Sequence, residues 1–381
     1  MKQLQRVKHA GAMLISALIL SAVLLTSCSS GPTSTTTGPQ GDGGKGCTKV
    51  GILLPETASS ARWETKDHPL LVQAVTTAIP GVHIDYNNAQ GSTATQLSQT
   101  ETDLANGDCI LIVGAHDSVA AASIVAKASA QNVPVIAYDR LIQSKNLSYY
   151  VSFENTKVGQ LQGQYILDHY KKYLNPQKPE PINIAIISGS ETDANSLLYS
   201  VGMHSVLDPL FATNVLKTVS ENFTPNWDNN TAQAEMESAL TDQQNNIQIA
   251  YAANDGMAGG VIAALSTARL SGKVMVTGQD ATTAGIHNIL AGTQGMTVYK
   301  PIVKEAQSTG LLVKALYNGS NISVLTHGQT TTTFNGGNIP SIFDTPIAVD
   351  INNIATTVIA DHFITKGDVC AGIPAGTAGV C

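Results

Sequence analysis

Short apolar segments alternate with amphipathic segments along most of the chain after residue 48. The apolar segments predict strands at 50–54, 82–86, 110–113, 135–138 and 149–153. Between them, apolar residues recur at helical spacing, as at Ala120, Ile124 and Ala128. The pattern then starts again, with strands predicted at 182–187, around Val219, and at 247–252, 274–277 and 296–299. Strands that alternate with helices indicate parallel sheets flanked by helices. Two successive sets therefore predict an α/β protein with two similar lobes.

The first 46 residues follow a different pattern. Three bases and no acid precede an apolar run over 10–25, which is too short and too interrupted for a membrane span. The run ends in Leu25-Thr26-Ser27-Cys28, which resembles a bacterial lipobox, so residues 1–28 are expected to be an export signal with lipid attached to Cys28. An ordinary secretory signal is the alternative. Residues 29–46 are rich in Ser, Thr, Gly and Pro and predict a flexible linker.

Charge excludes one class of partner. The 381 residues carry 21 Lys and Arg against 28 Asp and Glu, a net charge of −7. The leader accounts for three of the bases, so the remainder carries 18 bases against 28 acids, or −10. This surface would repel a polyanion, and no basic stripe offsets it. Nucleic acid is therefore not an expected partner.

Four cysteines follow the lipobox: Cys47, Cys109, Cys370 and Cys381. They lack the C-x-x-C spacing and the histidines of a zinc site, whereas export permits disulfides. Cys47 precedes the first predicted strand and Cys109 begins another, so a bridge is reasonable if these strands are parallel neighbours. Cys370 and Cys381 would close a C-terminal loop. Four free buried thiols are the alternative.

Polar and aromatic side chains follow nearly every predicted strand. Ligands of open α/β sheets bind beyond the carboxyl ends of the strands, where these side chains would meet. Planar Asp, Asn and Arg groups engage pairs of sugar hydroxyls, and indole rings cover the apolar faces of a sugar. The predicted binding residues are Arg62, Trp63, Asp139, Arg140, Asp193, Asn195, Trp227, Asn254, Asp280 and Lys300.

Each of these residues also has a purely structural interpretation. Asp193, Asn254 and Asp280 are placed to cap the helices that follow them. Arg140 could belong to a structural ion pair, and the two tryptophans could pack beneath loops. Helix capping does not explain Arg62, Trp63, Arg140 and Lys300 at the same edge, so the set favours a small-molecule cleft.

Catalytic motifs are missing from the sequence: it has no H-E-x-x-H and no G-x-S-x-G. The glycine-rich segment at 41–46 (GDGGKG) lies in the predicted linker with no strand before it, so it is not interpreted as a nucleotide-binding loop. No cofactor and no metal are therefore predicted. Asp139 with Asp280 leaves glycoside hydrolysis open as a weak alternative. His116 is expected to be a loop histidine rather than a ligand contact.

Several long collinear segments resemble one known family, the type I periplasmic binding proteins for monosaccharides in ABC import. The resemblance is greatest to its D-xylose-binding and multiple-sugar-binding members, and it covers residues 49 to about 353. The segments are 59–63 (SSARW), 137–142 (AYDRLI), 149–155 (YYVSFEN), 193–195 (DAN), Trp227 with 231–234, 254–255 (ND), 278–281 (GQDA) and 298–301 (VYKP).

The resemblance implies a two-lobed fold that closes on its ligand like a Venus flytrap, with three crossing strands as hinge. Lobe one would comprise 48–152 plus 301–336, and lobe two 153–300 plus 337–381. Arg62, Asp139 and Arg140 would bind sugar from the first lobe, and Asp193, Asn195, Asn254 and Asp280 from the second. Lys300 would be a hinge-side contact, with Trp227 and Trp63 on the ring faces.

The resemblance also implies a function. A monomeric, exported, lipid-anchored protein would bind a neutral monosaccharide, D-xylose first, and deliver it to a membrane permease and its ATPase. The alternative is a sensor that presents the bound sugar to a membrane receptor. The tail beyond about residue 353 has no counterpart in the family pattern.

Overall fold

The computed structural model describes residues 43–174 and 181–381, so Cys28, the expected export signal and most of the expected linker lie outside the described residues. Residues 43–46, the described end of the predicted linker, are packed against the first lobe and are not the flexible segment that the sequence predicts. Gly44 is buried against Ile110 and Leu316, and the amide of Gly46 donates to the carbonyl of Tyr317 at 2.9 Å. Ordered packing therefore already includes residues 43–46. Their glycines allow this close approach because they have no side chain.

The first lobe is built on a seven-stranded sheet of order β11-β12-β5-β4-β3-β1-β2. Every pairing in it is parallel except β11 with β12. The strands are β1 (Lys49–Leu54), β2 (His83–Asn88), β3 (Ile110–Val113), β4 (Val135–Tyr138), β5 (Tyr149–Phe153), β11 (Thr330–Thr332) and β12 (Asn338–Asp344).

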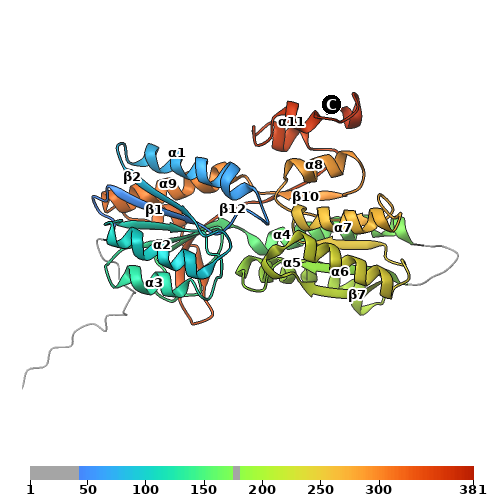
Figure 1. Cartoon of the computed structure of the whole chain (residues 1–381), viewed down its shortest axis with the longest axis horizontal. Helices are drawn as coiled ribbons and strands as arrows, with labels where there is room; N and C mark the ends of the chain where they lie inside the picture. Colours follow the sequence, from blue (N-terminus) through green and yellow to red (C-terminus); the bar gives the residue numbers. More distant parts are fainter. Residues whose placement is uncertain (1–42, 175–180) are drawn as a thin grey trace, which may run out of the picture. The chain divides into compact units, whose positions relative to one another are not determined.

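Alternating side chains of this sheet enter two separate cores, as expected for a parallel sheet covered on both faces. Ile110 and Ile112 pack with α1 and α9, whereas Leu111 and Val113 pack with α2 and α3. Figure 1 shows these two pairs of helices on opposite sides of the first sheet. The helices of this lobe are α1 (His68–Ala78), α2 (Thr93–Ala105), α3 (Ala122–Ser129), α9 (Ile302–Asn318) and α10 (Ser323–Thr326).

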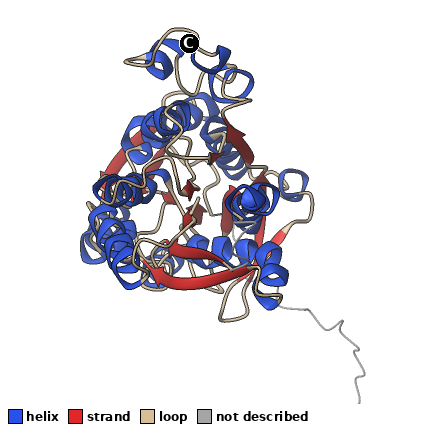
Figure 2. Cartoon of the chain, turned by 90° about the vertical axis from the view of Figure 1, so that its right-hand side faces the viewer, coloured by secondary structure: helices blue, strands red, loops and turns tan. Residues whose placement is uncertain are grey.

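The second lobe has a four-stranded parallel sheet of order β7-β6-β8-β9 and an antiparallel pair, β10 with β13. Figure 2 shows helices flanking the strands throughout. The strands are β6 (Ile182–Ser188), β7 (Leu216–Phe223), β8 (Ile249–Ala252), β9 (Met275–Val276), β10 (Met296–Tyr299) and β13 (Ile347–Asp350). The helices are α4 (Asn155–His169), α5 (Ala194–Ala212), α6 (Asn229–Asp242), α7 (Asp255–Thr267), α8 (Thr283–Leu290) and α11 (Lys366–Cys370).

The chain crosses between the lobes three times: from β5 to α4, from β10 to α9, and from β12 to β13. The third crossing corrects the boundary expected at residue 336. Strand β12 pairs with β5 in parallel, with Asp344 opposite Phe153, so the chain stays in the first sheet until Asp344. The change of lobe falls at residues 345–346, immediately before β13.

Both cysteine pairs are bonded, Cys47 to Cys109 and Cys370 to Cys381. Strands β1 and β3 are parallel neighbours, with Val50 opposite Ile110, and this register brings the starts of the two strands together. The second bond closes the C-terminal segment, whose Val369 and Val380 pack into one core with α8 and β13. No helix among the described residues is long and apolar enough to cross a membrane.

Candidate ligand-binding site

A pocket of about 300 Å³ lies between the two lobes, at the carboxyl ends of their strands. It contains eight of the ten predicted binding residues: Arg62, Trp63, Arg140, Asp193, Trp227, Asn254, Asp280 and Lys300. Its other lining residues are Ser59, Ser60, Tyr199 and Gln279. Asp139 and Asn195 do not line it. The sequence therefore predicts most of the pocket wall, and two residues of the set lie behind that wall.

Arg62 is held by carboxylates on several sides. Its Nε and NH2 atoms lie 2.9 and 2.7 Å from the two oxygens of Asp67, a paired geometry that fixes the guanidinium plane. Its NH1 donates to Asp139 Oδ2 at 3.0 Å. Both partners are buried, so the arginine reaches the pocket already oriented and neutralised. Removing either carboxylate would leave a buried cation without a partner.

Trp63 lies beside two guanidinium groups. The central carbons of Arg62 and Arg140 are 4.7 and 5.2 Å from the centre of its ring, within the range of cation–π attraction. The indole is 2% exposed. Because cations already contact its π system, Trp63 also orients the two arginines, in addition to lining the pocket.

Asp139 is the centre of the network behind the pocket wall. Its side chain accepts from Arg62, from Lys300 Nζ at 3.1 Å and from Asn195 Nδ2 at 3.0 Å. Its backbone is in the left-handed region at φ 60°, and its carbonyl accepts from Tyr150 and Ser152. Burial acts to raise the pKa of Asp139, but the charges of Arg62 and Lys300 outweigh it and hold that pKa well below its usual range. Asp139 therefore stays ionised and holds both cations in place.

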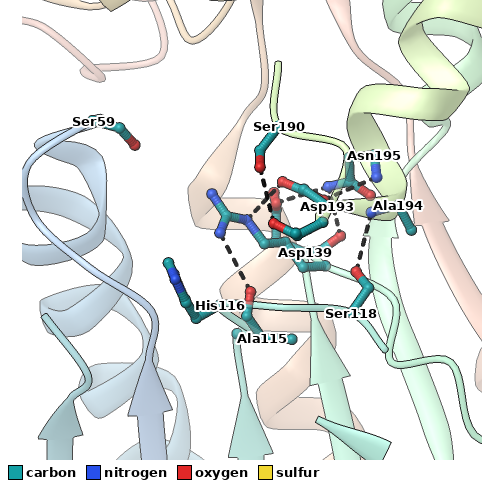
Figure 3. Close-up of polar contacts among 12 residues, drawn as sticks. Ser59, Ala115, His116, Ser118, Asp139, Ser190, Asp193, Ala194 and Asn195 are labelled. Carbon is teal, nitrogen blue, oxygen red and sulfur yellow. Dashed lines mark hydrogen bonds and ion pairs between the residues drawn. The ribbon is translucent and has the colours of Figure 1, made fainter. Parts of the chain in front are cut away.

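Several contacts join the lobes around the pocket, so the structure is a closed form. Arg140 Nε lies 2.8 Å from Asp193 Oδ2. Figure 3 shows Asn195 facing Asp139, and Ser118 Oγ accepting from the amide of Ala194 at 3.0 Å. The amide of Ser118 donates in turn to the carbonyl of Thr192 at 2.8 Å.

Asp193 and Asn254 are also helix caps. The side chain of Asp193 accepts from the amide of Asn195 at the start of α5, and that of Asn254 accepts from Met257 at the start of α7. Asp280 is different, because α8 is capped by Thr282. Asp193 and Asn254 therefore each cap a helix and also line the pocket, so the structural and the functional interpretation both apply to them.

Three buried polar atoms on the pocket wall have no hydrogen-bond partner among the described residues: Asp280 Oδ1, Trp63 Nε1 and Trp227 Nε1. Asp280 Oδ1 lies 3.7 Å from both Arg62 NH1 and Lys300 Nζ, too far for a direct hydrogen bond. Its Oδ2 accepts weakly from Ser60 Oγ at 3.3 Å. Since buried polar groups are normally satisfied, these atoms indicate where a hydroxylated ligand would bind.

Four pocket-lining residues are outside the predicted set, and the sequence indicates three of them better than the fourth. Ser59 and Ser60 belong to the segment before Arg62, and Gln279 precedes Asp280, so adjacency to predicted residues points to them. Tyr199 gives no such signal. It lies in the middle of α5, where an aromatic residue is typical of a core, and its hydroxyl accepts from Lys300 at 3.4 Å.

The described residues contain one group of acids close enough to hold a metal ion, Asp85, Asp103 and Asp108 in the first lobe. The ammonium of Lys49 lies 3.0 Å from Asp85 Oδ2 and 3.8 Å from Asp108 Oδ1, so a cation of the chain already occupies this cluster. Burial raises the pKa of Asp103 to about 6 and that of Asp108 to about 7. The cluster lies at the opposite ends of the strands from the pocket.

Two lobes of parallel sheet joined by three crossings, with a polar pocket closed between them, define a two-lobed ligand-binding protein. Comparison with known proteins agrees: a periplasmic binding protein domain matches residues 50–321, and the chain belongs to the periplasmic binding protein family, with its type I fold. Its relatives are substrate-binding proteins rather than enzymes, which removes the hydrolase alternative.

Among its relatives is the D-xylose-binding periplasmic protein of Haemophilus influenzae, 36% identical over 323 residues, covering 84% of this chain and 92% of that protein. The multiple sugar-binding periplasmic protein SbpA of Azospirillum brasilense is 33% identical, covering 83% of this chain and 90% of that protein. A solved ABC transporter solute-binding protein from Clostridium phytofermentans with bound β-D-glucose has a TM-score of 0.76 at 28% identity, covering 84% of this chain and 99% of that one.

Proposed function

We propose that this chain binds a neutral monosaccharide between its lobes, with D-xylose as the first candidate. The observation that carries the proposal is the pocket itself, whose two indoles and unpaired carboxylate oxygen suit a small polyhydroxylated ring. Asp280 Oδ1 lies 3.7 Å from Arg62 NH1 and from Lys300 Nζ, so it is not directly hydrogen-bonded to either. A ligand hydroxyl placed near Asp280 Oδ1 would donate to this oxygen and accept from Arg62 or Lys300. The names of the relatives support a sugar as ligand.

Charge balance favours a neutral ligand. The cations at the pocket, Arg62, Arg140 and Lys300, each lie against a buried carboxylate. A sugar acid or an amino sugar would bring a further charge into a site whose charges are already paired, and burying an unpaired charge is costly. Aldopentoses and aldohexoses in the pyranose form are therefore the expected class, and charged sugars are not. N-acetylated sugars are neutral, but their bulk does not suit a flat slot between Trp63 and Trp227.

Binding and closure are coupled, because the pocket has walls from both lobes. A ligand shifts the equilibrium toward the closed form only by the difference between its affinities for the closed and the open form. Contacts to Asp280 on one lobe and Arg62 on the other would supply that difference. The closed surface would then dock on the permease of an ABC importer, with the protein exported and tethered to the membrane through a lipid on Cys28.

The first experiment is calorimetry of the mature protein with D-xylose. Asp280→Ala should weaken binding tenfold or more, since leaving buried partners unpaired costs about 1–3 kcal/mol. Trp227→Ala should weaken it similarly through lost packing against the ring. Asp208→Ala is the matched control: its exposed carboxylate on α5 is far from the pocket wall, and binding should be unchanged. Failure of the wild type to bind any neutral monosaccharide would overturn the proposal.

The anchor and the importer role have separate tests. Cys28→Ala should release the protein from the membrane fraction, and retention without lipid would contradict the anchor. Uptake of labelled xylose should fall in cells that lack this chain and return when it is restored. Unchanged uptake together with intact xylose binding in vitro would favour the sensor alternative.

A further inference from the structure

A second, smaller recess adjoins the main pocket, and both lobes contribute to it. Ser59, Arg140 and Trp227 line both spaces, so a ligand in the main pocket can extend into the recess between these three residues. The residues that line only the recess are Glu56 and His116 from the first lobe and Ser190, Thr192 and Asn226 from the second. Figure 3 shows Ser59 and His116 on one side of this space and Ser190 on the other.

Most hydroxyls in the recess are already bonded within the protein. Ser59 Oγ donates to Glu56 Oε1 at 2.6 Å, and the hydroxyls of Ser190 and Thr192 lie 2.9 Å apart. The imidazole of His116, in contrast, has an atom that is not bonded within the protein. Its Nδ1 atom is buried and has no hydrogen-bond partner among the described residues. A buried, unpartnered ring nitrogen in the wall of a recess points to a ligand group that would bond to it.

His116 is held in place by its backbone rather than by its ring. It lies three residues after the end of β3, and its amide donates to Gln96 Oε1 at 3.1 Å. Burial and the nearby charge of Arg140 lower the pKa of His116, so the imidazole is neutral at pH 7. A neutral imidazole offers one donor and one acceptor nitrogen, which suits a hydroxyl and gives no preference for an anion.

The geometry limits what the recess can hold. A pentopyranose such as xylose carries only hydroxyls on its ring and has no carbon outside it, whereas a hexopyranose carries one exocyclic hydroxymethyl group. A second sugar ring would need as much room as the first, and the recess, which is lined by both lobes, is smaller than the main pocket. One carbon with one hydroxyl fits a recess that has an indole wall and, at His116 Nδ1, a buried ring nitrogen without a partner among the described residues.

We propose that this recess is a subsite for the hydroxymethyl group of an aldohexopyranose, with Nδ1 of His116 as the hydrogen-bond partner of its O6 hydroxyl. The proposal rests on the proposed function and deepens it. The same protein would bind D-xylose with the recess empty of ligand and D-glucose with the recess filled. His116 then determines the affinity for hexoses without affecting that for pentoses.

Calorimetry with four ligands tests this: D-xylose, D-glucose, 6-deoxy-D-glucose, and methyl β-D-xyloside, whose extra carbon is on the anomeric oxygen. His116→Ala should weaken glucose binding about fivefold or more, the value of one hydrogen bond, and should change xylose and 6-deoxyglucose binding less than about twofold. His116→Asn, which can place a polar atom near the position of Nδ1, should restore most of the glucose affinity. His83→Ala, at an exposed histidine that starts β2, is the control and should change none of the four.

The outcomes separate the two proposals. A wild type that binds xylose but not glucose would overturn the subsite and leave the proposed function standing. Equal losses for glucose, 6-deoxyglucose and xylose in His116→Ala would mean that His116 is only structural. If His116→Ala weakens the methyl xyloside and spares glucose, the recess takes the anomeric substituent and the assignment to O6 is wrong. A wild type that binds no sugar would overturn the proposed function itself.

Discussion

Arg140 and Asp193 form a buried ion pair between the lobes, with 2.8 Å between Nε and Oδ2. The other oxygen of Asp193 accepts from the amide of Asn195 and caps α5. One carboxylate therefore starts a helix of the second lobe and holds an arginine of the first. Since Arg140 lines both the main pocket and the recess, closure of the lobes and the shape of the site depend on the same contact.

Asp193→Asn separates these two roles. Asn caps helices as well as Asp does, so α5 should keep its start, but the ion pair with Arg140 is lost. We expect xylose affinity to fall tenfold or more, because Arg140 is left buried without its charge partner. Thermal unfolding of the ligand-free protein should show a further loss of about 1 kcal/mol in Asp193→Ala, which also loses the cap. Equal xylose affinities in Asp193→Asn and the wild type would contradict this role.

Gly189 determines the position of Trp227. A Cβ at Gly189 would overlap the indole ring, so only glycine lets the ring lie against this backbone. Gly189→Ala should displace the ring and weaken sugar binding tenfold or more. Gly259→Ala is the matched control, because a Cβ there meets nothing and alanine favours the helix interior of α7 by about 1 kcal/mol. Calorimetry showing equal affinities for the two variants would exclude a role of Trp227 in binding.

Much of this architecture is predictable from the sequence, because buried parallel strands appear as short apolar runs. The predicted bounds of β3, β4, β5 and β10 match those of the structure. Strands β11 and β12 gave no such signal: β11 is three threonines, and Pro340 interrupts the apolar positions of β12. For this reason the predicted third crossing, at residue 336, falls before the observed one at 345–346.

The pocket-lining residues are predictable as a set, because the carboxyl ends of parallel strands converge. Their separate roles are not. A sequence does not show that the ammonium of Lys300 and the guanidinium of Arg62 both pair with Asp139, which places that carboxylate behind the pocket wall rather than on it. The contribution of Tyr199 is equally invisible, because it comes from the middle of a helix.

The C-terminal segment contacts the first lobe through Lys66. Its Nζ donates to the carbonyl of Phe363 at 2.5 Å and lies 5.0 Å from the centre of the Phe363 ring. Phe363 packs in turn against Tyr299 of β10. Lys66→Ala should destabilise the closed form by roughly 1 kcal/mol, because it removes both contacts to Phe363. Stopped-flow measurements should then show about fivefold faster release of sugar. Lys157→Ala, at an exposed lysine on α4, should leave release unchanged.

The two disulfides should differ in their effect on stability. The Cys47–Cys109 bond closes a loop of 62 residues and the Cys370–Cys381 bond one of 11. On the loop-entropy model these bonds contribute about 4 and about 3 kcal/mol. Urea unfolding of the double alanine variant of each pair should therefore show the larger loss for Cys47 and Cys109. A larger loss for the C-terminal pair would show that it stabilises the packing of the tail in the native state.

Asp255 gives the folded state a dependence on pH. It is buried beneath the Asp280 loop, where it accepts from Gln294 Nε2 at 2.7 Å and from the amide of Thr282 at 2.8 Å. Burial raises the pKa of Asp255 to about 7, against about 3.9 in an unfolded chain. Between these two pH values the carboxyl of Asp255 is more protonated in the folded state than in the unfolded state. Its contribution to stability is therefore complete below about pH 4 and is lost as the pH rises to about 7, by at most roughly 1.4 kcal/mol per pH unit.

Asp255→Asn should remove this dependence, because an amide does not titrate and resembles the protonated acid. The amide still accepts from Thr282, and a turned Gln294 can accept from it through Oε1, which has no partner among the described residues. Urea unfolding from pH 4 to 7.5 should give a smaller slope of stability against pH for this variant than for the wild type. Asp103 and Asp108 also have raised pKa values, so the difference between the two proteins, rather than the slope itself, isolates Asp255. Asp168→Asn, at an exposed carboxylate on α4, should keep the wild-type slope. A curve for Asp255→Asn parallel to that of the wild type would mean that folding does not raise the pKa of Asp255.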